Sequence, residues 1–206
     1  MLYISKLPFY LGLFESEIAS KYEIHEKTFD PESQHGRFHI LRCLFLAEFV
    51  LRAYSEEGVE VDQDMVYLSV LFHDIAREGN GIDEWEEQSA DACFNFMILN
   101  SYDEYYSKQT SQLILKNDSL SIEEQVLYDV DVLDYHRFFP TMFFEILFDD
   151  SKLKFGSIND VSSFIDNKIR HDLIKYAQWL VIETECFNID MKTKELIDHL
   201  LEFKNM

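Results

Sequence analysis

The sequence is poor in the residues that make tight turns. It contains 6 glycines and 3 prolines among 206 residues, whereas β-sandwiches and β-barrels need such residues at many turns. Hydrophobic residues make up 47% of the chain, which is enough to bury a sizeable core. The composition therefore predicts an all-α protein of long helices and argues against a disordered chain.

Cysteines and long apolar runs are also scarce. Cys43, Cys93 and Cys186 occur singly with no CxxC spacing, which argues against both a zinc knuckle and a disulfide framework. No apolar run approaches the ~20 uncharged residues that a transmembrane helix needs, and Lys6 and Pro8 interrupt the apolar N-terminal stretch. We therefore expect a cytoplasmic protein with reduced cysteines and no membrane contact.

Basic residues are few. The chain has 18 Lys+Arg and 39 Asp+Glu, which gives a formal net charge of -21. Such a field repels phosphate backbones and anionic lipid surfaces, so a long nucleic acid is not an expected partner. A small phosphorylated substrate is still compatible with this charge, since a bound divalent cation and one or two arginines can reverse the field locally.

The spacing of apolar residues predicts helices along most of the chain, folded as a single domain over residues 1–206. Helices are expected at 36–54, from a cap at Asp62 to near Arg77, and from a cap at Asp83 through Met97. Further helices are expected at about 107–117, 121–138, 140–148, 158–186 and 191–204, the second of them starting at a capping box between Ser121 and Glu124. We expect a compact multi-helix bundle, with a motif-bearing core at about 30–137 and C-terminal helices at about 140–206 packed on it.

Histidine and aspartate recur on these helices in an order that suits a metal site. The residues are His35, His39, His73, Asp74, Asp129, Asp131 and Asp134. Imidazole and carboxylate together accept one divalent ion among Mn, Fe, Co, Ni, Zn and Mg. Because residues four apart share a helix face, spacing alone does not choose between His35 and His39. Asp131 and Asp134 share one flank of their helix, whereas Asp129 points elsewhere and is expected at the surface or in a cap.

Three segments resemble motifs of one known family. HGRFHILRC resembles an HGxxHxxRV opening, LSVLFHDIAREGN resembles AALLHDIGR, and DVDVLDYHR resembles DADRLDxxR. These motifs, in this order, are typical of small bacterial members of the HD-domain superfamily of metal-dependent phosphohydrolases, and the resemblance spans about residues 30–137. It implies an all-α HD domain whose metal ligands are His39, His73, Asp74 and Asp131, with His35 next to them.

The chain also departs from this family in informative ways. No histidine lies between His73 and His136, where dinuclear members add further ligands, so one metal ion is expected. Trp85 stands where small relatives carry the histidine of an HGxxSA motif, and Asn117 stands where another histidine is usual. These two positions leave open an HD-fold ligand-binding or regulatory protein with weak or no catalysis.

The function implied by the resemblance is hydrolysis of a phosphoester, as a phosphatase or phosphodiesterase acting on a small phosphorylated metabolite or nucleotide. Asp74 would bind the metal and receive a proton from water, while Arg42 and then Arg77 are the first choices for holding the phosphate. A structural salt bridge is the alternative for each arginine. A purely helical interaction protein, in which the His73-Asp74 pair is accidental, is the remaining alternative.

Overall fold

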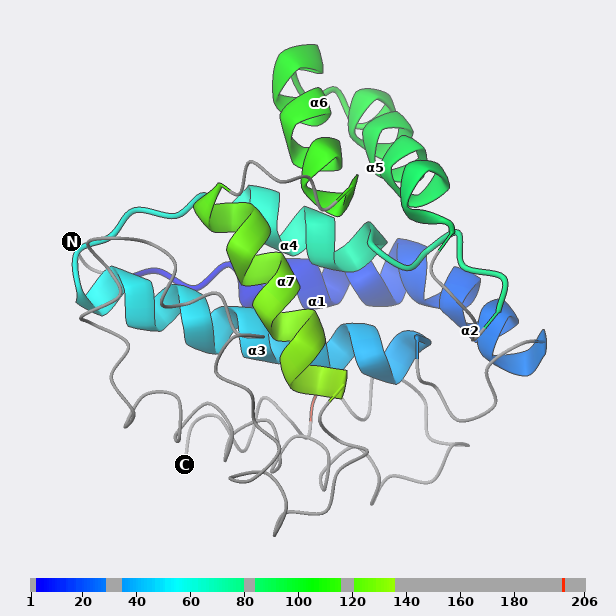
Figure 1. Cartoon of the computed structure of the whole chain (residues 1–206), viewed down its shortest axis with the longest axis horizontal. Coiled ribbons are helices and arrows are strands. Elements are labelled where there is room, and N and C mark those ends of the chain that lie inside the picture. Colours follow the sequence, from blue (N-terminus) through cyan, green and yellow to red (C-terminus); the bar gives the residue numbers. More distant parts are fainter. Residues whose placement is uncertain (1–2, 29–34, 80–83, 116–120, 136–197, 199–206) are drawn as a thin grey trace, which may run out of the picture.

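The structure, a computed structural model, describes residues 3–28, 35–79, 84–115, 121–135 and 198 (Figure 1). Within these residues the regular elements are helices and none is a strand, which confirms the all-α prediction. The helices expected at 140–148, 158–186 and 191–204 lie, apart from Asp198, outside the described residues. The helices are α1 (Leu7–Leu13), α2 (Ala19–Thr28), α3 (Arg37–Glu56), α4 (Gln63–Phe72), α5 (Glu86–Leu99), α6 (Glu104–Gln112) and α7 (Ile122–Tyr135), with a π-helical turn at Phe14–Ile18 and a 3-10 turn at Leu113–Leu115.

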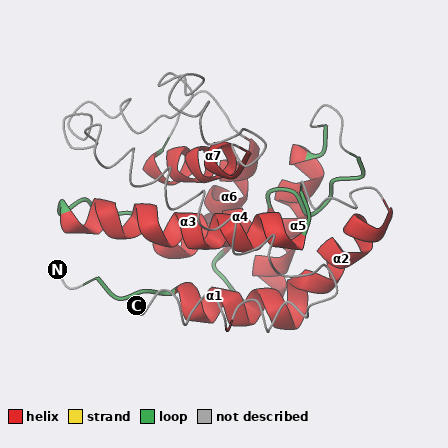
Figure 2. Ribbon diagram, turned by 90° about the horizontal axis from the view of Figure 1, so that it is seen from below, coloured by secondary structure: helices red, strands yellow, loops and turns green. Residues whose placement is uncertain are grey.

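Helices α3 and α4 form a central layer. Helices α1 and α2 cover one side of this layer, and α7 crosses the other side in contact with both α3 and α4 (Figure 2). Helices α5 and α6 pack against each other beside α4 (Figure 1). No helix in the described part of the chain is both long and apolar enough to cross a bilayer.

Helix α3 begins one residue after the predicted start and runs two residues past the predicted end at Tyr54. It is buried along most of its length because apolar residues occupy nearly all of its faces, as expected for a helix covered on two sides. Close packing at its start leaves no room for a side chain at Gly36, because a Cβ there would overlap Glu26. Glu26 is itself held there, because its Oε1 accepts a hydrogen bond of 2.8 Å from the Arg37 backbone N–H.

Helix α4 starts as the sequence predicts but ends early. The Asp62 carboxylate caps it by accepting hydrogen bonds from the backbone N–H groups of Asp64 and Met65, at 3.0 and 3.1 Å. The helix ends at Phe72, whereas the sequence predicted an end near Arg77. Tight turns replace it, with the Arg77 N–H bonded to the Asp74 carbonyl at 3.1 Å. The His73-Asp74 pair therefore lies just beyond the helix end, where its side chains can turn toward α3 and α7.

The predicted start of α7 agrees with the structure, whereas those of α5 and α6 differ from it or lie outside the described residues. The Ser121 hydroxyl accepts a hydrogen bond of 3.2 Å from the Glu124 N–H, and α7 begins at the next residue, Ile122. The expected cap at Asp83 lies outside the described residues, and α5 has Trp85 at its N-cap without a side-chain capping bond. Helix α6 starts three residues before the predicted 107, because Asp103 caps it by accepting from the Tyr106 N–H.

The N-terminal segment, for which the sequence predicted no element, is helical and is anchored by one buried carboxylate. Glu48 Oε2 accepts hydrogen bonds from the hydroxyls of Tyr3, Ser5 and Tyr67, at 2.8, 2.8 and 2.7 Å. Arg52 reaches the other oxygen of Glu48 at 3.1 Å. This Glu48 cluster links the chain start to both helices of the central layer.

Replacing Asp62 with alanine is expected to destabilise the fold. The substitution removes the cap of α4 and also the acceptor of the Tyr106 hydroxyl, which lies 2.9 Å from Asp62 Oδ1. Loss of an N-cap alone costs about 1 kcal/mol, and loss of a further hydrogen bond about 1 kcal/mol more. Urea unfolding followed by circular dichroism would measure this loss. An unchanged unfolding midpoint would contradict the capping role.

Candidate metal centre

Two histidines and two aspartates from three parts of the fold converge at one place. His39 lies in the first turn of α3, His73 and Asp74 follow α4, and Asp131 lies in α7. The Nε2 atoms of His39 and His73 are 3.0 Å apart. Asp131 Oδ1 lies 3.5 and 3.8 Å from these two nitrogens, and Asp74 Oδ2 lies 3.6 Å from each. The structure thus brings together the four residues that the resemblance names as ligands.

The hydrogen-bond partners of the two imidazoles determine which nitrogen faces the cluster. His39 Nδ1 lies 2.6 Å from Asp134 Oδ2, and His73 Nδ1 lies 2.8 Å from the Val70 carbonyl oxygen. Both partners accept hydrogen bonds, so in the neutral form of either ring the hydrogen sits on Nδ1 and the lone pair on Nε2. Burial lowers the pKa of His39 and so favours the neutral ring. The carboxylate of Asp134 acts in the opposite direction but does not outweigh burial.

The arrangement is therefore a group of electron-pair donors that point at one another. Two imidazole lone pairs and two carboxylate oxygens meet where three of the four side chains are almost fully buried. Around an ion with metal–ligand distances of about 2.1 Å, neighbouring donor atoms are about 3.0 Å apart in octahedral and about 3.4 Å apart in tetrahedral geometry. The separations of the pairs that include an imidazole nitrogen, 3.0 to 3.8 Å, are close to this spacing or slightly longer. The donor set fits a divalent cation, whose charge would offset the mutual repulsion.

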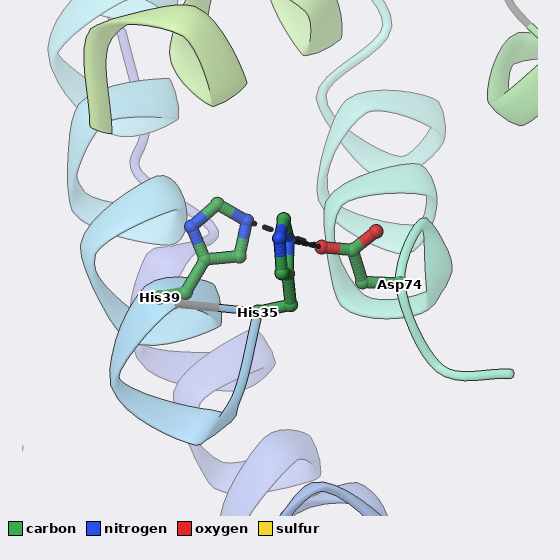
Figure 3. A group of neighbouring side chains, drawn as sticks. All are labelled: His35, His39 and Asp74. Carbon is green, nitrogen blue, oxygen red and sulfur yellow. Dashed lines mark hydrogen bonds and ion pairs between the residues drawn. The ribbon is translucent and has the colours of Figure 1, made fainter. Parts of the chain in front are cut away.

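Asp74 is held on both of its oxygens. His35 Nδ1 lies 2.9 Å from Oδ2, and Arg77 Nη1 lies 3.7 Å from Oδ1. Figure 3 shows His39 and Asp74 reaching toward each other from α3 and from the end of α4, with His35 beside Asp74. Burial acts to raise the pKa of Asp74, but the neighbouring histidines, in their protonated form, outweigh burial and hold the pKa well below its usual range. The contacts on both oxygens fix the position of the carboxylate.

The structure gives His35 and His39 different positions, which the spacing had left open. His39 is buried, and its Nε2 faces His73 and Asp131. His35 precedes α3, keeps 21% of its side chain exposed and binds Asp74. The donor atoms of His35, His39 and Asp74 still lie within 4.8 Å of one another, so His35 stands at the edge of the same centre.

Arg42 does not take the position expected of a phosphate-binding residue. It is buried, its Nε lies 2.5 Å from Asp134 Oδ1 and its Nη2 lies 3.1 Å from Asp134 Oδ2. The guanidinium is thus directed at a carboxylate of the protein, which is the salt-bridge alternative. The substrate-binding role expected of Arg42 stays a prediction, and the contact that the structure shows is the salt bridge with Asp134.

Arg77 lies beside Asp74, but its guanidinium also contacts other groups of the protein. Its Nε donates a hydrogen bond of 2.9 Å to the Gly79 carbonyl, and its guanidinium carbon lies 5.5 Å from the centre of the Trp85 ring. Trp85 therefore stacks on the arginine that lies beside Asp74. The catalytic role expected of Arg77 stays a prediction.

The sequence did not predict the role of Asp134 and misplaced Asp129. Asp134 was expected only to share a flank with Asp131, and the signal for its role is its position one turn after Asp131, as Arg42 is one turn after His39. Asp129, expected at the surface or in a cap, is fully buried. Asn117 lies outside the described residues.

Comparisons with protein-family models, with curated proteins and with solved structures find no match for this chain. The case for a function therefore depends on the residues and distances described above. Those distances describe a candidate metal-binding site and do not by themselves identify a reaction.

Proposed function

We propose that this chain is a metal-dependent phosphohydrolase of the HD type, with one divalent cation held by His39, His73, Asp74 and Asp131. The proposed reaction is hydrolysis of a phosphoester in a small phosphorylated metabolite or nucleotide, in the cytoplasm. The observation that carries the proposal is the pair of Nε2 atoms 3.0 Å apart, each with its Nδ1 bound to an acceptor. A positive charge between the two Nε2 atoms and the two carboxylates would stabilise this arrangement, which supports a bound cation.

The groups of residues that could hold an ion support a single centre. In the described part of the chain, each group of three such residues includes His39. The two groups that include Asp74 or Asp131 share Nε2 of His39 and so form one site, whereas Asp134 of the third group lies on the Nδ1 side and is paired with Arg42. The cation would be Mn, Fe, Co, Ni, Zn or Mg, because imidazole and carboxylate donors are mixed.

The chain's own residues would orient the reactants. A divalent cation in such a site lowers the pKa of water and polarises a phosphoryl oxygen. Asp74, fixed as an anion between His35 and Arg77, could take the proton that the attacking water releases. Asp131 and His35 are the partly exposed members, at 27% and 21% of their side chains, and so mark the edge that a small substrate could reach.

Metal content and hydrolysis measured together test this proposal. Purified protein, stripped with a chelator and reloaded with each cation, is expected to bind about one ion per chain and to hydrolyse members of a phosphomonoester and phosphodiester panel. A chelator should remove the activity and the cation should restore it. The matched control is Asp91→Asn, an exposed carboxylate of α5, which should keep metal content and activity. No bound metal and no metal-induced thermal stabilisation would refute the proposal.

The engagement of both arginines favours a second candidate, a metal-containing ligand-binding or regulatory protein. Arg42 binds Asp134, and Arg77 binds the Gly79 carbonyl and stacks on Trp85, so both cations expected to hold phosphate already have protein partners. In this case the protein would bind about one metal ion but turn over none of the esters. A rise in melting temperature on adding a nucleotide would then identify the ligand class.

A further inference from the structure

Behind His39, on the side away from the cluster, lies a buried ion pair. Asp134 in α7 uses Oδ2 to accept from His39 Nδ1 at 2.6 Å. Arg42 in α3 contacts both oxygens of Asp134, and the three side chains are at most 5% exposed. We infer that Asp134 and Arg42 are positioning residues that keep His39 in the one tautomer able to bind a cation through Nε2. The inference rests on the proposed metal centre.

Asp134 acts through His39 and does not bind the cation itself. The two nitrogens of an imidazole ring point away from each other, and Asp134 lies on the Nδ1 side. His39, Cys43 and Asp134 do form a compact group of possible ligands, but Arg42 already supplies a positive charge there. The contact of Asp134 with Nδ1 instead fixes the hydrogen on that nitrogen, which leaves the lone pair on Nε2 facing His73.

Arg42 has the complementary role of holding the carboxylate. A buried carboxylate without a cationic partner would be unstable, and it would be free to rotate away from the histidine. The planar guanidinium binds both oxygens and so fixes the plane of the Asp134 carboxylate, which a lysine could not do in the same way. The orientation of His39 is thereby determined from α3 and from α7 together.

The arrangement follows from a simple repeat along the two helices. Helix α3 carries His39 and, three residues later, Arg42, while α7 carries Asp131 and, three residues later, Asp134. Residues three apart lie on the same helix face. Each helix therefore contributes one residue that faces the cation site and one residue that supports His39 from behind.

Asp134→Asn tests the inference with two readouts. The asparagine oxygen can still accept from Arg42, which turns the amide hydrogens toward His39 Nδ1 and favours the wrong tautomer. Two-bond ¹H–¹⁵N spectra of the metal-free protein should show His39 protonated on Nδ1 in the wild type and on Nε2 in the variant, with the signal assigned by its loss in His39→Gln. Affinity for Zn²⁺ or Mn²⁺, measured by chelator competition, should fall roughly 10–100-fold.

Asp129→Asn is the matched control, because Asp129 is an equally buried carboxylate of the same helix whose charge acts on Tyr54. It should leave the tautomer of His39 and the metal affinity unchanged within about twofold. Arg42→Lys keeps the charge but loses the paired contact, and a loss of affinity intermediate between the wild type and Asp134→Asn is expected. It gives an independent test if Asp134→Asn does not fold.

The failures of the two proposals are distinguishable. A wild-type chain that binds no cation refutes the metal centre itself. A wild-type chain that binds a cation, together with an Asp134→Asn variant of equal affinity and unchanged His39 tautomer, refutes the positioning role alone.

Discussion

Asp74→Ala is expected to abolish cation binding and with it the proposed hydrolytic activity. The substitution removes a carboxylate whose Oδ2 lies 3.6 Å from both His39 and His73, so one of the four donors is lost. A metal ion contributes several kcal/mol to a phosphoryl-transfer reaction, and each 1.36 kcal/mol is a factor of ten, so activity should fall roughly 1,000-fold or more. Elemental analysis and the rate of ester hydrolysis measure the two losses.

Thermal unfolding separates this loss of function from a loss of fold. A cation that binds only the native state raises its stability, so the wild type should melt at a higher temperature when the metal is added. Asp74→Ala should unfold cooperatively and show no such rise, whereas Asp91→Asn on the exposed side of α5 should behave as the wild type. Unchanged metal content and activity in Asp74→Ala would disprove the proposed centre.

Glu48→Ala is expected to give the largest loss of stability. The substitution deprives the hydroxyls of Tyr3, Ser5 and Tyr67 of their common acceptor, and Tyr67 is fully buried. Burial and the nearby charge of Glu48 raise the pKa of Tyr67, so its hydroxyl stays protonated and keeps its need for an acceptor. A buried donor left without a partner costs about 1–3 kcal/mol, and with the other two lost bonds the total should be about 3 kcal/mol.

Urea unfolding of Glu48→Ala and Glu48→Gln, followed by circular dichroism, tests this expectation. Glutamine keeps one carbonyl oxygen as an acceptor, so its loss should be about half of that of alanine. Glu48 lies nine residues after His39 on α3, which is about 13 Å along the helix axis, so metal affinity should not change in either variant. Equal stability of alanine variant and wild type would show that the cluster is not an anchor.

The parts of the fold that the sequence predicted are those with local signals. Helix α3 has a continuous apolar pattern, and α7 has a capping serine at Ser121, so their bounds were predicted within a few residues. The helices before residue 28 had no such signal. They are held by distant contacts, such as Tyr10 with Asp64 at 2.7 Å and the Tyr22 hydroxyl with the Leu71 carbonyl at 2.9 Å. Contacts of that kind depend on the tertiary fold and leave no periodic pattern.

The sequence predicted the candidate metal ligands but not the residues that hold them in place. The resemblance named His39, His73, Asp74 and Asp131, while spacing alone could not separate His39 from His35, because residues four apart share a face of a predicted helix. In the structure His35 precedes α3, and α7 brings Asp131 to Nε2 of His39 and Asp134 to its Nδ1. The same approach of α7 gives Arg42 a buried partner in Asp134, a salt bridge that the sequence had left open beside a role in holding the substrate.

The early end of α4 affects the electrostatic potential at the candidate metal site. Peptide dipoles along a helix add up, so the carboxyl end of a helix carries a partial negative charge of about half an elementary charge. Helix α4 stops at Phe72, and His73 caps that end while its Nδ1 donates to the Val70 carbonyl in the last turn. The backbone of α4 therefore directs its negative end toward the point where the two Nε2 atoms meet, and a cation there would be attracted by the peptide groups as well as by the side chains.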